Sequence, residues 1–310
     1  MKPLALLAAR GHLAPIDAAF GAVLARRAAA RVDLPDARVV GLTGALLSGG
    51  RSRGHSCLDL AALAGTAPWP DVGDGADALR LPDTATWRAV LARSRLCRPC
   101  AADGVSASVG EDAAPTPLVL DGDRLYLHRY HAAECRLAAA VRGRLAGATA
   151  RPVDAASAAS FRRLFPAPPA GVAAAAGGPD WQAVAAAAAL RGRLTVITGG
   201  PGTGKTTTVA RVLALLLERD PALRVAVAAP TGKAAARLAE AIAANAAGLP
   251  IGPALRDALP REGRTLHRLL GYQPWHDTFA HGPDRPLAED VVVVDEASMV
   301  DVLLMDALFA

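Results

Sequence analysis

The sequence predicts an α/β protein in which a mainly helical amino-terminal region precedes a parallel sheet built around a phosphate-binding loop. A short apolar run, a glycine-rich loop and a leucine-rich helical stretch follow one another from Leu194 to Leu217. A run of valines further on ends in two carboxylates, Asp295 and Glu296. Roughly the first hundred residues instead carry apolar side chains at helical spacing. Helices should therefore dominate the first part, and alternating strands and helices the last.

The glycine-rich loop matches the pattern G-x-x-x-x-G-K-T from Gly199 to Thr206. The run Leu194 to Thr198 before it predicts a strand, and Val209 to Leu217 after it predicts a helix, which is the order that this motif requires. Backbone N–H groups in such a loop, together with the helix N-terminus, bind phosphates. We expect Lys205 to reach the outer phosphates of a nucleotide and Thr206 to bind Mg²⁺. A glycine-rich turn that matches by chance is the alternative.

Lysine is scarce in this chain. Of 34 basic residues 31 are arginine, and the lysines are Lys2, Lys205 and Lys233. Ammonium and guanidinium groups are not interchangeable at phosphate sites, so the two internal lysines stand out. Lys233 closes the loop Ala229-Pro-Thr-Gly-Lys233, after a predicted strand from Arg224 to Ala229. With Thr231, this loop fits a nucleic-acid backbone, and an ordinary β–α turn is the alternative.

The valine run Val291 to Val294 predicts a fully buried strand that leads directly into Asp295 and Glu296. At the end of such a strand, Asp295 can hold hydrated Mg²⁺ opposite Thr206. Glu296 beside it can orient and deprotonate an attacking water. Acidic residues also terminate strands without any catalytic role. Only their joint occurrence with the glycine-rich loop therefore indicates a catalytic role.

Further side chains suit a nucleotide or a nucleic acid. Gln182 lies one helix before the loop, where its amide can donate to and accept from an adenine edge. His267 and Arg268, in the stretch Thr265 to Leu270, can contact phosphates. Tyr272 and Trp275 can stack on bases, although Trp275 can equally belong to the core.

The amino-terminal part predicts short helices without a catalytic constellation. From Pro15 to Arg31, the apolar residues Ile16, Phe20, Val23 and Leu24 form one helical stripe. Val39 to Leu47 and Leu58 to Leu63 predict two further helices. His12, His55 and Asp59 are scattered, which favours surface or capping roles.

Later elements of this half follow from capping and turn signals. Asp83 can cap a helix that buries Trp87, Val90 and Leu91. Asp121-Gly122, between Leu118 to Leu120 and Arg124 to Leu127, predicts a β-hairpin. A helix from Ala132 to about Leu145 should follow, and two connections are expected, a polar one from Asp103 to Pro117 and a linker from Phe161 to Asp180. We expect domains at 1–112 and 177–310, with the hairpin, helix and linker at 113–176 between them.

Composition sets the broad class. The 310 residues are 52% hydrophobic and 20% charged, and the net charge of +5 fits a polyanionic partner only weakly. Cys97-Arg-Pro-Cys100 has the spacing of half a zinc site, but Cys57 and Cys135 form no second pair, so reduced thiols are the expectation. Neither a signal peptide nor a long apolar run is evident, which predicts a soluble cytoplasmic protein.

Five stretches together resemble the superfamily 1 DNA helicases of the RecD type. They are Trp181-Gln182, Gly199 to Thr208, Ala229 to Arg237, Thr265 to Gly271 and Val294 to Met299. The amino-terminal half also resembles RecD, the alpha subunit of exodeoxyribonuclease V (RecBCD). The stretches that carry this likeness are Ala45 to Ser48, Pro115 to Pro117, Gly122 to Leu127 and Leu164 to Pro166.

This resemblance implies a RecA-like P-loop NTPase lobe with a parallel sheet, working as a 5′ to 3′ ATP-driven motor on DNA. RecB-like and RecC-like subunits would be its partners, and the amino-terminal domain would dock on the RecC side. The cofactors would be ATP and Mg²⁺, with Thr206 and Asp295 on the metal and Lys205, Asp295 and Glu296 catalytic. Thr231, Lys233, His267 and Arg268 would lie in DNA-contacting motifs. The expected nucleotide-binding residues are Gln182, Gly199, Gly200, Pro201, Gly202, Thr203, Gly204, Lys205, Thr206 and Thr207.

A complete motor of this type has two such lobes, and the second supplies most of the arginines that stabilise the transferring phosphate. This sequence ends at Ala310, shortly after Glu296, so we expect it to lack the second lobe and the later strands of the first. An incomplete first lobe with an exposed apolar sheet edge is therefore expected. Three alternatives stay open: a RecD-like helicase that works alone, a nucleotide- and partner-binding module without motor activity, and an unrelated P-loop ATPase. The sequence shows no nuclease carboxylate cluster, so nuclease activity would come from a partner.

Overall fold

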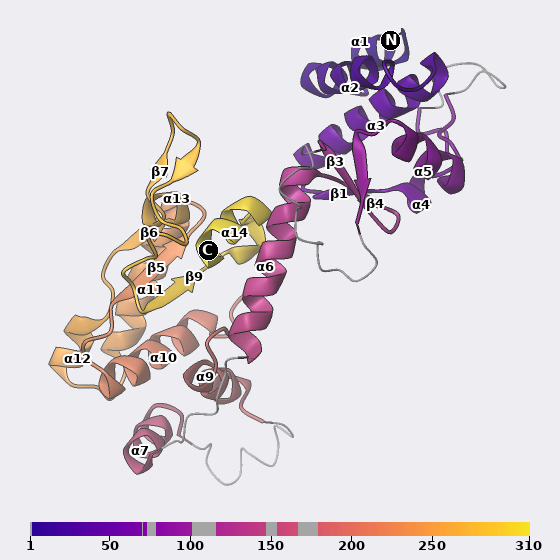
Figure 1. The fold of residues 1–310 in the computed structure, drawn as a ribbon. Helices are drawn as coiled ribbons and strands as arrows, with labels where there is room; N and C mark the ends of the chain where they lie inside the picture. Colours follow the sequence, from indigo (N-terminus) through magenta and orange to yellow (C-terminus); the bar gives the residue numbers. More distant parts are fainter. Residues whose placement is uncertain (1, 70, 73–78, 101–115, 147–153, 167–178) are drawn as a thin grey trace. The chain divides into compact units, whose positions relative to one another are not determined.

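The computed structural model describes residues 2–69, 71–72, 79–100, 116–146, 154–166 and 179–310. The chain divides into two compact units, Met1–Arg136 and Leu137–Ala310 (Figure 1). Several predicted boundaries lie outside the described residues. They are the domain limits near 112 and 176, the polar connection after Asp103 and most of the expected linker. No helix within the described ranges combines the length and apolarity needed to cross a bilayer.

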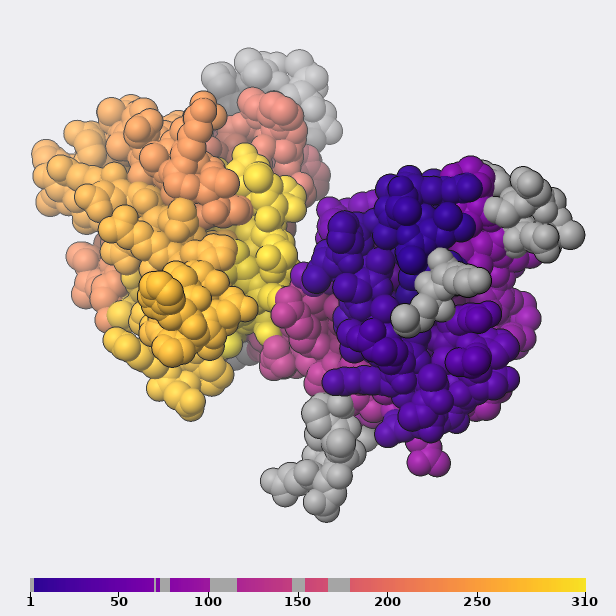
Figure 2. All heavy atoms as spheres, turned by 90° about the horizontal axis from the view of Figure 1, so that it is seen from above, coloured from indigo at the N-terminus to yellow at the C-terminus, as the bar shows by residue number. Residues whose placement is uncertain are grey.

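The first unit begins with three helices packed on one another, α1 (Lys2–Ala9), α2 (Pro15–Ala28) and α3 (Leu34–Ser52). In Figure 2 these helices, in indigo, form a continuous surface of the unit. The packing of α2 on α3 depends on glycine, because a Cβ at Gly21 would collide with the carbonyl oxygen of Gly41. This close approach corrects the expected apolar stripe: Leu24 is buried, but Ile16 is 72% exposed and Val23 is also exposed. The backbones meet along small residues, which periodicity of large side chains does not reveal.

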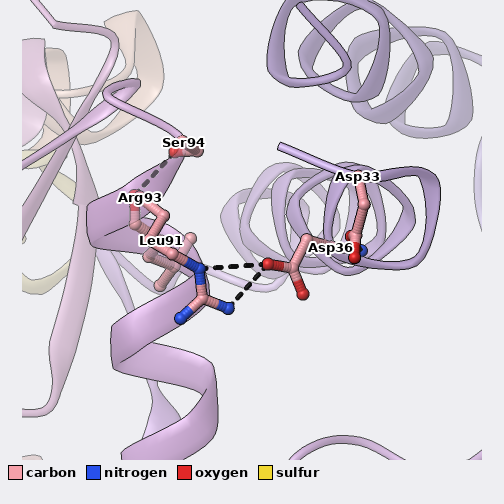
Figure 3. A network of polar contacts seen from close by, with 5 residues as sticks. All are labelled: Asp33, Asp36, Leu91, Arg93 and Ser94. Carbon is pink, nitrogen blue, oxygen red and sulfur yellow. Dashed lines mark hydrogen bonds and ion pairs between the residues drawn. The ribbon is translucent and has the colours of Figure 1, made fainter. Parts of the chain in front are cut away.

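Capping and charge join the next helix, α5 (Thr84–Arg93), to α3. As predicted, the Asp83 carboxylate accepts the Thr86 N–H at 2.9 Å, and Trp87 is fully buried. The indole N–H of Trp87 donates to Thr43 Oγ1 of α3 at 2.7 Å. Figure 3 shows Arg93 reaching from α5 to Asp36 at the start of α3, with a distance of 2.6 Å between Nη2 and Oδ2. A buried indole and a surface ion pair thus fix the two helices together.

A four-stranded sheet completes the first unit, in the order β1-β4-β3-β2. The predicted hairpin forms from β3 (Leu118–Asp121) and β4 (Arg124–Leu127), and its turn uses Gly122 at φ +57°. Two strands join it that the sequence analysis did not predict, β1 (Cys57–Asp59) and β2 (Cys97–Pro99). The segment Leu58 to Leu63 is therefore a strand end followed by one helical turn, α4 (Leu60–Leu63), which Asp59 caps. Pairing with a neighbouring strand, and not local propensity, therefore determines that this segment begins as a strand.

Helix α6 (His128–Ala146) follows the hairpin and includes the helix expected from Ala132 to Leu145. In the second unit, α7 (Ala155–Leu164) covers the start of the segment expected as a linker. Leu164 and Phe165 are buried against α9 (Trp181–Arg191) and α10 (Lys205–Arg219). The linker prediction was therefore wrong for these residues, because their apolar side chains belong to a core.

The remaining elements of the second unit alternate between strands and helices. They are β5 (Val225–Ala229), α11 (Gly232–Ala247), α12 (Pro253–Ala258), β6 (Gly263–Thr265), α13 (Leu266–Leu269), β7 (Tyr272–Gln273), β8 (Thr278–Phe279), β9 (Val291–Val294), the 3-10 turn η2 (Ala297–Met299) and α14 (Val302–Phe309).

The main sheet of this unit is parallel, in the order β6-β5-β9, as predicted for an α/β lobe. Alternate side chains face opposite sides: Val227 and Val293 pack against α10 and α11, whereas Ala228 and Val294 pack against α13 and α14. Helices therefore cover both faces, and the carboxyl ends of the three strands share one edge of the unit. That arrangement positions ligands in open α/β sheets.

Two expectations about this sheet were wrong in detail. Residues 192–200 form no strand, and Val196 in the expected strand is 81% exposed. Val291 to Val294 are half-buried, not fully buried. Both findings reflect the open side of β9. Among the described residues β9 pairs only with β5, so the other side of β9 has no neighbouring strand. A strand forms only where a partner accepts its hydrogen bonds. The expected exposed apolar edge of the sheet is thereby confirmed.

Candidate nucleotide-binding site

The glycine-rich loop has a backbone conformation that requires glycine at two positions. Gly202 and Gly204 adopt left-handed conformations, at φ +75° and +79°, which side chains rarely tolerate. A Cβ at Gly204 would also collide with the side-chain amide of Gln182. Thr203 Oγ1 donates to the Gly200 carbonyl at 2.9 Å and closes the loop on itself. Helix α10 starts directly after it, so its first N–H groups face the loop.

Lys205 is folded into the loop. Its Nζ donates to the carbonyl oxygens of Gly199 at 2.7 Å and Gly200 at 2.8 Å. A phosphate is a stronger partner for an ammonium group than a neutral carbonyl, because the hydrogen bond is then charge-assisted on both sides. The loop therefore holds the cation at the place where an anion would be bound.

The two acidic residues follow β9 at the same edge. The N–H of Asp295 donates to the Ala228 carbonyl at 2.9 Å, which extends the pairing of β9 with β5 by one residue. Asp295 Oδ1 accepts the N–H of Glu296 at 2.9 Å. Glu296 has φ +52° and ψ +38°, a conformation that costs free energy in a residue with a side chain. The strained turn directs Glu296 away from the strand and leaves it exposed.

A single cavity of about 1130 Å³ joins the loop to the acidic strand end, and Lys205, Thr206 and Asp295 all line it. Half of its lining residues come from the segment 189–197 and from Val291 to Val294, and most of the others come from α10. Its volume therefore includes the open side of β9 as well as the phosphate end. The ammonium, hydroxyl and carboxylate that the sequence analysis placed together do share this space.

Gln182 contacts the loop, and a residue that the sequence analysis missed holds it there. Its Nε2 donates to the Thr203 carbonyl at 3.1 Å, while Arg211 Nη1 donates to its Oε1 at 3.4 Å. The Arg211 guanidinium lies 5.1 Å from the centre of the Phe165 ring. Arg211 Nε is a buried nitrogen that has no hydrogen-bond partner among the described residues. The sequence signal that could have indicated this role is the position of Arg211, a charged residue six positions after Lys205 within an apolar helix face.

Thr207 is used within the protein. Its hydroxyl donates to Asn245 Oδ1 at 2.7 Å and joins α10 to α11. Its backbone N–H lies in the first turn of α10, where helices leave such groups free for a ligand. Asn245 was not singled out in the sequence, because nothing local marks an asparagine inside a helix as a contact of the loop.

The residues expected to contact DNA lie after β5 and β6. Ala229 is paired with Thr265 in these parallel strands, so the two loops that follow are neighbours. Thr231 and Thr265 cap α11 and α13 through their hydroxyls. Lys233 is exposed.

Within the second loop, His267 and Arg268 are exposed, and the His267 ring meets the Tyr272 ring edge-on at 5.2 Å. A hydrogen bond to Asp277 raises the pKa of Tyr272 above its usual value. Trp275 is 94% exposed, so the alternative that placed it in the core was wrong.

Two family models match the chain over most of its length. Residues 9–126 match the N-terminal domain of RecBCD enzyme subunit RecD, and residues 182–310 match an AAA domain. The fold and the glycine-rich loop thus define the class of protein: the second unit is a P-loop nucleotide-binding domain.

Among curated proteins, RecBCD enzyme subunit RecD of Mycolicibacterium smegmatis is 41% identical over 290 residues, which is 91% of this chain and 45% of that protein. RecD of Mycobacterium tuberculosis is 41% identical over 264 residues, covering 81% of this chain and 38% of the relative. The ATP-dependent RecD2 DNA helicase of Deinococcus radiodurans is 42% identical over 118 residues, 38% of this chain and 14% of the relative. The chain belongs to the RecD family and spans about half the length, or less, of these relatives.

Proposed function

We propose that this chain contributes the ATP-binding lobe and the partner-docking domain of a RecD-type 5′ to 3′ DNA helicase. It would act with RecB-like and RecC-like subunits in the repair and recombination of double-strand breaks. The observation that carries the proposal is the shared cavity of Lys205, Thr206 and Asp295. It lies at the same sheet edge as the loops after β5 and β6. Nucleotide and nucleic-acid contacts would then be coupled through one rigid edge.

The donor set fits a magnesium nucleotide. The backbone N–H groups of the loop and the first turn of α10 would bind phosphate oxygens, and Lys205 would leave its two carbonyl partners for the outer phosphates. Thr206 and Asp295 offer the hydroxyl and carboxylate oxygens that Mg²⁺ prefers, and the ion, when bound, supplies charge neutralisation. Glu296 would orient the attacking water and take its proton. Gln182, held by Arg211, would recognise the adenine edge.

The exposed residues of the two neighbouring loops would contact DNA. Thr231, Lys233, His267 and Arg268 present a hydroxyl, an ammonium, an imidazole and a guanidinium at the ends of β5 and β6, and such groups bind phosphates. Tyr272 and the exposed Trp275 add rings on which bases can stack. We propose no nuclease activity for this chain, so DNA degradation would depend on a partner.

DNA-stimulated ATP hydrolysis by the complex that contains this chain tests the proposal. Lys205→Gln should abolish the stimulated hydrolysis and leave assembly intact, because the substitution removes one cation and no buried contact. Lys2→Gln is the matched control and should hydrolyse ATP as the wild type does. Lys233→Gln should raise the DNA concentration needed for stimulation without changing ATP affinity. Full hydrolysis by the Lys205→Gln complex would disprove the assignment of the site.

A helicase that works alone is the second candidate, and the similarity to the RecD2 helicase favours it. The match of residues 9–126 to the RecD N-terminal domain favours the complex instead. Copurification with RecB-like and RecC-like subunits separates these two. Substantial ATP turnover by the 310-residue chain alone would argue against a site that needs a second lobe.

A further inference from the structure

Four side chains that the nucleotide site does not use meet at one end of the first unit's sheet. Cys100 directly follows β2 and Asp121 ends β3, and these parallel strands finish side by side because the Cys100 N–H donates to the Leu120 carbonyl at 2.7 Å. His131 lies near the start of α6. One possible ligand atom from each of Cys100, Asp121 and His131 lies within 4.8 Å of the other two.

Cys135 adds a second thiol to this cluster. It lies one helical turn after His131, so the two side chains share a face of α6. Its Sγ is 3.8 Å from His131 Nδ1 and 3.9 Å from Nε2. The Cys135 sulfur thus lies against the same imidazole that Cys100 and Asp121 approach.

The cluster is built around a buried imidazole. The His131 side chain is 8% exposed, and its Nε2 lies 3.9 Å from Asp121 Oδ2. The Tyr126 ring of β4 packs edge-on against it, with 5.1 Å between ring centres, and limits the ring's rotation. The buried imidazole thus lies next to a thiol of its own helix and a carboxylate of β3, with the Cys100 thiol within 4.8 Å.

Both the ligand types and the spacing select one metal. Two thiolates, one imidazole and one carboxylate are all zinc ligands, and a closed set of four is typical of structural zinc sites. With metal–ligand bonds of about 2.0–2.3 Å, ligand atoms around a tetrahedral Zn²⁺ lie about 3.3–3.8 Å apart. The separations within Cys100, Asp121 and His131 are at most 4.8 Å, and Cys135 Sγ lies 3.8 Å from His131 Nδ1. Side-chain rotations at Cys135 would bring its sulfur to the other two ligands.

Strand geometry explains why the Cys97-x-x-Cys100 spacing did not indicate this site. Cys97 lies inside β2 and is buried in the core of the unit, where burial raises the pKa of its thiol to about 12. Residues three apart along an extended strand point to opposite sides, so Cys97 and Cys100 do not converge. The partner of Cys100 is Cys135, 35 positions later in the chain.

We propose that Cys100, Asp121, His131 and Cys135 bind one Zn²⁺ in a structural site. The ion would join the ends of β2 and β3 to the first turns of α6. These segments are distant from one another in the sequence, so no local contact links them. Because the unfolded chain lacks such a site, zinc binding adds directly to the stability of the first unit.

The test measures bound metal in the intact 310-residue protein. We expect the purified protein to retain one equivalent of zinc, and metal-free protein to bind Co²⁺ with the absorption of a thiolate-ligated tetrahedral site. All four cysteines lie in the first unit, so this absorption cannot arise from Mg²⁺-type ligands at the nucleotide loop. Zinc should also raise the unfolding temperature of the first unit.

Two ligand variants and one control complete the test. Cys100→Ser and Cys135→Ser should each weaken zinc binding by more than the roughly 10- to 100-fold that follows loss of an outer-shell partner. Cys57→Ser removes an equally half-buried thiol outside the cluster and should bind zinc normally. Absence of stoichiometric zinc and of the Co²⁺ band in folded wild-type protein overturns the proposal, as does equal loss in the Cys57→Ser control. Should either ligand variant fail to fold, protection of Cys100 and Cys135 from alkylation by zinc in the wild type decides the matter.

Discussion

The two units of this chain differ in how completely they bury their apolar residues. In the first unit, one core cluster extends from α1 to the hairpin and includes Trp87, Leu91 and Leu118, all fully buried. In the second, the apolar residues form three clusters, the edge strand β9 of the three-stranded sheet is half-buried, and Val196 is 81% exposed. The residues proposed to bind nucleotide thus belong to the unit with the less complete core. Stability and site chemistry lie in different parts of this chain and are open to separate tests.

The largest effect should come from the core of the first unit. Trp87→Ala removes a fully buried indole and its hydrogen bond to Thr43. A cavity of this kind costs about 3–5 kcal/mol, enough to unfold the unit under ordinary conditions. Chemical denaturation monitored by circular dichroism measures the loss. Nucleotide binding by the second unit should persist, and its loss would show that the two cores fold as one.

A smaller and more local effect is expected in the loop. Gly204→Ala places a Cβ at φ +79° and against the Gln182 amide, so nucleotide affinity should fall at least tenfold. Gly65→Ala is the matched control, because Gly65 also has a positive φ, +68°, but has open space around it. The control should lose only the roughly 1–2 kcal/mol of the backbone conformation and bind nucleotide normally. Titration with a fluorescent ATP analogue compares the two, and equal affinities would argue against the loop as the site.

The smallest effect concerns Arg211. Arg211→Met keeps an unbranched apolar stem next to Phe165 but removes the donor that holds Gln182. We expect a loss of a few-fold in the preference for ATP over GTP, with stability unchanged or raised, because a buried unpartnered nitrogen disappears. Arg26→Met, exposed in the last turn of α2 in the first unit, is the control. An unchanged preference would remove Gln182 from base recognition.

Much of the second unit followed from local pattern. The helix after the loop, strand β5 and the acidic end of β9 were predictable, because each depends on residues within one turn or one strand. The Asp83 cap and the Asp-Gly hairpin of the first unit were readable for the same reason. These features use short-range hydrogen bonds, which sequence neighbours determine.

The errors share a different physical origin. The run from Leu194 to Thr198 has strand composition but no strand, since its hydrogen bonds depend on a neighbour beside β9. The helix α2 buries Gly21 and Leu24 but not Ile16, because α3 approaches along small residues. Arg211 and Asn245 acquire their contacts only when α10 packs against α9 and α11. Each outcome depends on a second segment distant in the chain.

By itself the sequence determined the position of the glycine-rich loop and of the helix after it, and it predicted the phosphate- and metal-binding residues there, because spacing in a loop and the start of a helix is a local property. Only the tertiary structure decided that Cys100, Asp121, His131 and Cys135 meet, while Cys97, the sequence partner of Cys100, lies in the core. The pairing of β2 with β3 and the position of α6 bring Cys100, Asp121 and His131 together, and Cys135 lies against the His131 ring. Sheet register is set by long-range contacts, so a site built on it has no signature in residue spacing.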